Sequence, residues 1–128
     1  MPATIRQRLI DLLAIGRVAN LPTVWSNVIV GFLLAWSTAD VFFLAQVSTD
    51  EVVFRSNLVA LALLLLGTSC AYLFGTYLND WKDAEFDREH RPERAIPSGR
   101  WSRRAILCLA LSFAVVAATC FIYLGFNQ

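Results

Sequence analysis

Three long stretches without a single charged residue constrain the fold of this chain more than any other feature of its sequence. They cover residues 18–39, 56–79 and 105–128, and each is long enough to cross a bilayer, which takes about 20 predominantly apolar residues. Only 16% of the chain is charged, against roughly 25% in a typical soluble domain. We therefore predict an all-α integral membrane bundle, one membrane domain over residues 1–128, with three transmembrane helices at about 18–39, 56–79 and 105–126.

The distribution of lysine and arginine predicts which ends of these helices face the cytoplasm. Three of the 11 basic residues precede the first stretch, one lies in the segment 40–55, and seven lie in the segment 80–104. Because cytoplasmic connections carry the excess of positive charge, we expect a multi-pass protein of the cell membrane with its N-terminus and second connection in the cytoplasm. A cleaved signal peptide is an alternative for the first stretch, since residues 37–39 are small, but the long flank before it contains Asp11.

The N-terminal flank has a helical pattern of its own. Residues 5–17 read IRQRLIDLLAIGR, with apolar side chains at Ile5, Leu9, Leu12, Leu13 and Ile15. We interpret this segment as an amphipathic helix at the membrane interface, with an ordinary cytoplasmic flank as the alternative.

The second connection, residues 79–104, holds most of the charge of the chain. Asn79, Asp83 and Asp87 follow one another at intervals of four residues, and Asp80 precedes Asp83 by three. If the second transmembrane helix continues past the membrane surface, these side chains share one face of it. Pro92 would then end the helix.

Like charges aligned on one helix face destabilise the helix, so something must neutralise them. Mg²⁺ prefers carboxylate oxygens and usually shares its coordination shell with substrate phosphates. Arginine binds phosphate in bidentate fashion. Acids and bases mixed at a membrane edge therefore predict a site for Mg²⁺ and a diphosphate, with a solvated loop of internal salt bridges as the alternative. Nothing in the sequence indicates nucleic acid as a partner.

A row of small residues, Gly67, Ala71 and Gly75, repeats at intervals of four within the second stretch. Small residues let another helix or a lipid chain approach closely. The row predicts either helix packing or the lining of an apolar tunnel below the charged segment.

The charged segment resembles two motifs of the UbiA-type membrane prenyltransferases. The order Asn79-Asp80-x-x-Asp83-x-x-x-Asp87 resembles the family's first aspartate-rich motif, and residues 94–99, RAIPSG, resemble the R-P-[IL]-x-S-G signature that follows it. Residues 17–31 also resemble the start of the family's first helix. The resemblance covers nearly the whole chain but only the front part of the larger family bundle.

The resemblance implies an activity, the transfer of an isoprenyl group from an isoprenyl diphosphate donor to an aromatic or lipid-like hydrophobic acceptor. It implies Mg²⁺ held by Asn79, Asp80, Asp83 and Asp87, of which the three aspartates are the catalytic residues. The substrate-binding residues it implies are Asn79, Lys82, Arg91, Arg94, Arg100 and, as a polar side chain within the first transmembrane helix, Asn27.

The chain departs from the family pattern in ways that bear on activity. It contains no second aspartate motif, Ala95 stands where the family prefers proline, and it ends directly after the third stretch. We therefore expect a truncated chain that works with a missing C-terminal half or as an oligomer. The alternatives are a non-catalytic three-helix membrane protein or inactive fragment and, with less support because no Asp-Gly pair occurs, an enzyme like the CDP-alcohol phosphotransferases.

Overall fold

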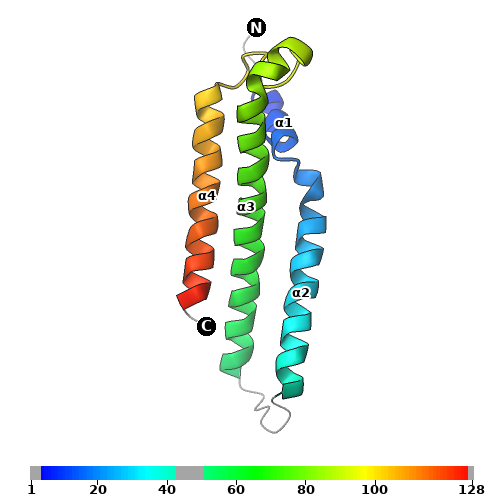
Figure 1. Cartoon of the computed structure of the whole chain (residues 1–128), viewed down its shortest axis with the longest axis vertical. Coiled ribbons are helices and arrows are strands. Elements are labelled where there is room, and N and C mark those ends of the chain that lie inside the picture. The colour runs from blue at the N-terminus through cyan, green and yellow to red at the C-terminus, as the bar shows by residue number, and fades with distance from the viewer. Residues whose placement is uncertain (1–3, 43–50, 127–128) are drawn as a thin grey trace.

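The computed structural model of the chain is a bundle of three long helices with a short helix at one end (Figure 1). It describes residues 4–42 and 51–126. Helix α1 spans Ile5–Ile15, and a 3-10 turn at Val18–Asn20 leads into α2, Leu21–Phe42. Helix α3 spans Glu51–His90 and α4 spans Arg103–Phe126. Three of these helices are long and apolar enough to cross a membrane, as the uncharged stretches predicted, and the described residues form no strand.

The structure extends the second predicted helix at both of its ends. The apolar stretch covers residues 56–79, but α3 has 40 residues and is therefore about 60 Å long at 1.5 Å per residue. Charged residues indicate where the surroundings of a helix change from lipid to water, and they do not by themselves end the helix. The acidic segment after residue 79 therefore continues as part of α3. The helix ends at His90, because Pro92 disfavours helical backbone in the residue before it and lacks the donor for another turn.

Local capping explains where the short helix and the last helix begin. The Oγ1 atom of Thr4 accepts a hydrogen bond from the backbone N–H of Gln7 (3.3 Å) at the start of α1. In the same way Ser102 accepts from the N–H of Ala105 (3.1 Å) at the start of α4. Pro22 lies in the first turn of α2, where its missing N–H costs little.

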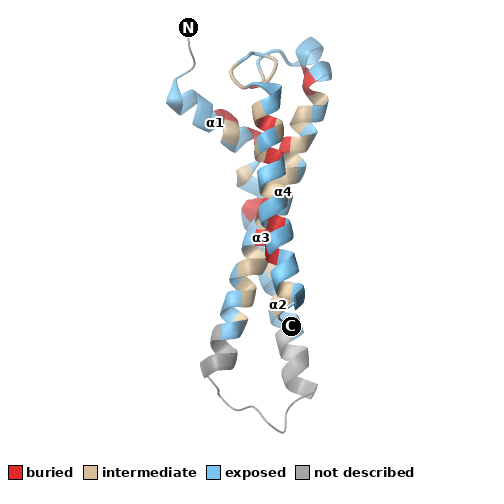
Figure 2. Cartoon of the chain, turned by 90° about the vertical axis from the view of Figure 1, so that its left-hand side faces the viewer, coloured by how far each residue is buried: buried red, intermediate tan, exposed pale blue. Residues whose placement is uncertain are grey.

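The hydrophobic core lies at the end of the bundle where α1 and the charged segment lie, and buried residues continue from it along the contact between α3 and α4 (Figure 2). The core there contains Ile15 of α1, Tyr77 of α3, Ala95 of the turn that joins α3 to α4 (residues 91–102), and Ile106 and Ala110 of α4. The Tyr77 hydroxyl donates a hydrogen bond to the Leu12 carbonyl oxygen (2.9 Å) and so ties α1 to α3. A packed core thus lies directly beside the segment predicted to carry the chemistry.

The row of small residues on α3 is used in two different ways. A Cβ atom added at Gly67 would lie 2.9 Å from the Phe121 ring and 3.1 Å from Cys120 Cβ, so glycine there permits the close approach of α4. A Cβ atom at Gly75 would meet nothing within 4 Å, and Ala71 is exposed. Helix packing therefore explains the glycine at position 67, whereas Ala71 and Gly75, which are nearer the acidic residues, face open space.

Large apolar side chains on α2 and α4 remain exposed in the isolated chain. Examples are Val30 and Leu34 on α2 and Val115 and Ile122 on α4, each more than half exposed. An apolar surface of this kind is compatible with lipid or with further helices. It agrees with the predicted membrane bundle.

Candidate functional site

The aspartate-rich motif forms one side of α3 just beyond the apolar part of this helix, and this side is the acidic face. It consists of Asn79, Asp80, Asp83 and Asp87. Successive residues of an α-helix are turned by about 100°, so Asn79, Asp83, Asp87 and Asp80 fall within an arc of about 100° in that order around the axis. The continuation of α3 through residue 90 therefore meets the condition on which the predicted common face depended.

At the near edge of this face, Asn79 and Asp83 are bonded to each other. The Asn79 amide nitrogen donates a hydrogen bond to a carboxylate oxygen of Asp83 at 2.8 Å. Asn79 is exposed and Asp83 is partly exposed. These two side chains form the open part of the acidic face, and the amide oxygen of Asn79 and the second oxygen of Asp83 take no part in the bond between them.

At the other edge, Asp87 and Asp80 share one arginine. Asp87 is only 3% exposed and accepts a hydrogen bond from Arg94 Nη1 at 2.7 Å. The same nitrogen lies 3.7 Å from Asp80 Oδ1. Because a buried carboxylate is strongly destabilising without a counterion, Arg94 supplies the charge that lets both aspartates lie close together here.

The turn that carries Arg94 is compact. Backbone hydrogen bonds join Ser98 N–H to the Arg94 carbonyl, Gly99 N–H to the Ile96 carbonyl and Trp101 N–H to the Ala95 carbonyl, each at 3.0 Å. Gly99 has a φ of 75°, a left-handed conformation that favours glycine. The RAIPSG segment thus folds back against the end of α3 and places the Arg94 side chain over the acidic face.

Arg100, predicted to bind substrate, is bonded instead to an acid from the start of the chain. Its Nε and Nη2 atoms donate to the two carboxylate oxygens of Asp11 at 2.7 and 3.0 Å. The hydrogen bonds from Arg100 hold the pKa of the Asp11 carboxyl below its usual value, and Asp11 in turn raises the pKa of Arg100. Both side chains therefore stay charged at neutral pH.

Asp11 was missed as a site residue by sequence reasoning. A signal for it existed, because Asp11 is the one acid in the N-terminal flank, which otherwise carries three arginines. Its partner is 89 residues away, and no spacing rule connects positions so far apart.

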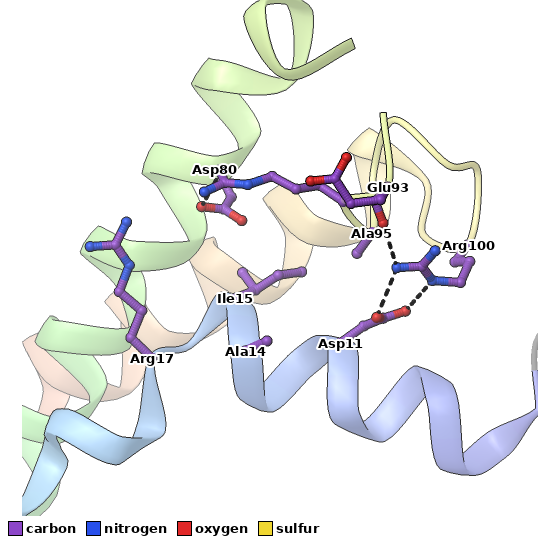
Figure 3. A pocket seen from close by; sticks show the side chains of 9 residues that line it. Asp11, Ala14, Ile15, Arg17, Asp80, Glu93, Ala95 and Arg100 are labelled. Carbon is purple, nitrogen blue, oxygen red and sulfur yellow. Dashed lines mark hydrogen bonds and ion pairs between the residues drawn. The ribbon is translucent and has the colours of Figure 1, made fainter. Parts of the chain in front are cut away.

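A cavity of about 280 Å³ lies between α1, α3 and the turn. Figure 3 shows the Asp11–Arg100 pair at one side of it and Asp80 with Arg17 at the other. Arg17 reaches this position from a left-handed backbone conformation, φ 45°, at the junction of α1 and the 3-10 turn. The cavity is lined by Asp11, Ala14, Ile15, Arg17, Asp80, Glu93, Arg94, Ala95 and Arg100.

Three other predicted site residues do not join this cluster. Lys82 and Arg91 are exposed at the end of α3 and in the turn after it, and Asn27 is exposed on α2. Their side chains make no hydrogen bond or ion pair with other residues in the described part of the chain. They remain available to a ligand, but the structure does not bring them together.

The oxygen donors of the acidic face suit a metal ion that shares its coordination shell with phosphate. Within residues 4–42 and 51–126, no three His, Cys, Asp or Glu side chains are grouped closely enough to hold a metal ion by themselves. Mg²⁺ that binds together with phosphates usually takes one or two carboxylates from the protein and its other ligands from phosphate and water. Asn79 and Asp83 each have one oxygen outside their mutual hydrogen bond, and Asp80 and Asp87 share the same helix face, so the residues present fit that smaller requirement.

Three membrane-length helices and an acidic helix face countered by arginine define a membrane protein with a charged site at one end of its bundle. The family model described as UbiA prenyltransferase family matches residues 32–127, and the chain belongs to this family. The resemblance seen in the motif residues is thereby confirmed. Residues 17–31, which also resembled the family, lie outside the matched range.

Two curated relatives are both named digeranylgeranylglyceryl phosphate synthase. The protein from Korarchaeum cryptofilum is 36% identical over 68 residues, which are 53% of this chain and 24% of the relative. The protein from Methanoregula boonei is 33% identical over 99 residues, which are 77% of this chain and 29% of the relative. The matched part of this chain thus covers less than a third of each relative. No solved structure matches the chain significantly.

Proposed function

We propose that this chain carries the donor half of a membrane prenyltransferase site, in which Mg²⁺ and arginine hold the diphosphate of an isoprenyl donor. The proposal rests on the acidic face and its counterion. Helix α3 continues beyond its apolar part and carries this face, and Arg94 forms ion pairs with Asp80 and Asp87 on it. Family membership supports a prenyltransferase over the non-catalytic and phosphotransferase alternatives.

In this proposal the motif residues have separate roles. Asn79 and Asp83, with Asp80 and Asp87, would hold Mg²⁺, which when bound offsets negative charge on the leaving diphosphate. Arg94 lies where it can pair with diphosphate oxygens, and the exposed Lys82 and Arg91 can reach the same anion from its solvent side. Such pre-placed charges favour departure of the diphosphate because that is where negative charge builds up.

The apolar surface below the motif suits the isoprenyl chain. Gly75 and Ala71 form an open strip on α3 directly beneath the acids, so the tail would run along this strip into the bundle. The surrounding helices would also keep water away from the allylic carbon of the donor. Asn27 on the neighbouring helix α2 is proposed as a polar contact for the acceptor.

The acceptor is proposed to be lipid-like. The names of the two relatives state a prenylated glycerol phosphate as their product, which supports a lipid over a soluble acceptor. The large apolar surface left on α2 and α4 supports a further part of the bundle, from a C-terminal half or a second copy, as the partner that completes the site. The N-terminus and the motif are proposed to face the cytoplasm. The location of α1 and the motif at the same end of the bundle (Figure 1) agrees with the shared excess of positive charge.

The test is binding of geranylgeranyl diphosphate to the detergent-purified chain, with Mg²⁺ and with EDTA. We expect binding in Mg²⁺ that falls at least about tenfold in EDTA, a loss of about 1.4 kcal/mol, and an equal loss in the double variant Asp83→Asn with Asp87→Asn. The matched control is Glu89→Gln, which removes an acid of the same helix that is exposed and outside the motif. Binding that survives EDTA, or that falls equally in the control, would refute the metal-bridged diphosphate.

A further inference from the structure

Two charged side chains are buried among the described residues, Asp11 at 6% and Asp87 at 3% exposure. Each is paired with an arginine of the same turn, Asp11 with Arg100 and Asp87 with Arg94. The turn therefore makes one charged contact with the motif on α3 and one with the N-terminal helix α1. The contact with α1 belongs to no motif.

We propose that Asp11 is a positioning residue of the donor site: through Arg100 it fixes the turn that holds Arg94 over the acidic face. This inference rests on the proposed function for its effect on donor binding. It assigns Arg100 to the support of the site, and it assigns α1 a role in the site as well as at the membrane.

The bonds of Arg100 supply the connection. While Nε and Nη2 bind the Asp11 carboxylate, Nη2 also donates to the Glu93 carbonyl oxygen at 2.9 Å. Glu93 is the residue directly before Arg94. A guanidinium held at both oxygens of a buried carboxylate has little freedom, so it fixes the backbone from which the Arg94 side chain departs.

Independent contacts keep α1 in place, so that Asp11 can serve as an anchor. The Tyr77 hydroxyl is bonded to the Leu12 carbonyl. A Cβ atom at Gly16 would lie 3.0 Å from a Leu73 side-chain atom, which shows how closely the end of α1 approaches α3. Asp11 therefore projects from a helix that is packed against the same α3 that carries the motif, and α1, α3 and the turn form a closed set of contacts.

The side of α1 opposite Asp11 is apolar, which lets this helix lie between the bilayer and the site. Ile5, Leu9 and Leu13 are each more than half exposed, whereas Asp11 and Ile15 are buried. The exposed residues recur at intervals of four and form an apolar stripe, as expected for a helix that rests on the bilayer. Asp11 points away from that stripe toward the turn.

The first experiment compares donor affinity in single and combined variants. We expect Asp11→Asn to weaken Mg²⁺-dependent binding of geranylgeranyl diphosphate about tenfold, as for loss of one charge-assisted contact. In an Arg94→Gln background, Asp11→Asn should have no further effect, because its influence passes through Arg94. A residue that only stabilises the fold would weaken binding equally in both backgrounds, and that result would overturn the proposal.

A conservative variant and a charge reversal guard against variants that fail to fold. Asp11→Arg should abolish donor binding, whereas Asp11→Glu keeps a carboxylate for Arg100, leaves the bond from Arg100 to the Glu93 carbonyl oxygen in place, and should bind donor to within about threefold of the unmodified chain. If Asp11→Arg folds by circular dichroism and binds donor as the unmodified chain does, the Asp11–Arg100 pair does not position the site. Glu89→Gln is again the control for a general loss of negative charge.

A second measurement separates this inference from the proposed function. A spin label at Ser98→Cys, in a background without native cysteines, reports the mobility of the turn in the absence of donor. Asp11→Asn should increase that mobility and Glu89→Gln should not. If the unmodified chain fails to bind donor, the proposed function is wrong, but the spin label still shows whether Asp11 holds the turn. Equal mobility of the turn in Asp11→Asn and Glu89→Gln would refute the positioning role of Asp11.

Discussion

Replacement of Arg94 by glutamine tests whether one arginine stabilises the acidic face. The Asp87 side chain is 4% exposed and its contact with Arg94 is 2.7 Å long, so Arg94→Gln leaves a buried carboxylate without its counterion. Breaking a buried ion pair costs about 3–5 kcal/mol. Because the Arg94 side chain is 30% exposed and water partly screens the pair, we expect the free energy of unfolding to fall by about 2–3 kcal/mol.

Three further variants show whether the loss of stability in Arg94→Gln comes from the unpaired Asp87 carboxylate. Asp87→Asn should cost about 1 kcal/mol, since an asparagine still accepts a hydrogen bond. The double variant should cost less than the sum of the two single variants, because of the two carboxylates near Arg94 only Asp80, at 3.7 Å, then loses its counterion. Arg88→Gln is the matched control: its salt bridge with Glu85 joins side chains that are 65% and 75% exposed, and such exposed pairs contribute about 0–1 kcal/mol.

Reversible unfolding in mixed detergent micelles, followed by circular dichroism, gives the free energy of unfolding of the unmodified chain and of the four variants. If Arg94 is the counterion of Asp87, the two substitutions should be coupled by about 1.5 kcal/mol or more. Effects that add to within about 0.5 kcal/mol, the usual result for independent sites, would show that Arg94 is not the counterion of Asp87.

Three further predictions concern the rest of the chain. The pKa of Asp11 is lowered by Arg100, so the stabilisation from this pair should be complete above the unfolded value of about 3.9 and disappear as pH falls through the lower folded value; unfolding measured from pH 5 downward should lose this component in Asp11→Asn. Gly67→Ala should destabilise the chain by about 1–3 kcal/mol in the same unfolding assay, because the new methyl group would press on an aromatic ring of α4, whereas Gly75→Ala should be neutral or stabilising. A cysteine at Ser98 should react with an impermeant maleimide in inverted vesicles and not in intact cells, and labelling from outside the cell would contradict the proposed orientation.

The features that could be predicted from the sequence are those set by the helical repeat within one segment. The three uncharged stretches located the long helices, and the interval between Asn79, Asp83 and Asp87 placed them on one face once α3 continued. Pro92 marked the end of α3 within two residues. In each of these cases the physical cause acts over a few neighbouring residues.

The contacts that could not be predicted join segments far apart in the chain. Asp11 and Arg100 meet because α1 folds back against α3, and this depends on packing around Gly16 and Tyr77 and not on any repeat. The row of small residues shows the same limit, since Gly67 and Gly75 look alike in the sequence but face a helix and open space respectively. Which neighbour covers a helix face is a property of the whole bundle.

The length of α3 has a consequence for how a substrate would arrive. The hydrocarbon core of a bilayer is about 30 Å thick, and the apolar part of α3 from residue 56 to residue 79 spans about 36 Å at 1.5 Å per residue. The acidic face begins directly above it and therefore lies at the depth of the lipid headgroups. A donor with its tail in the membrane would carry its diphosphate at the same depth, so that the encounter becomes a search within a plane. Its rate would then follow the surface density of the donor and the competition from anionic headgroups, more than the concentration of any solute in the cytoplasm.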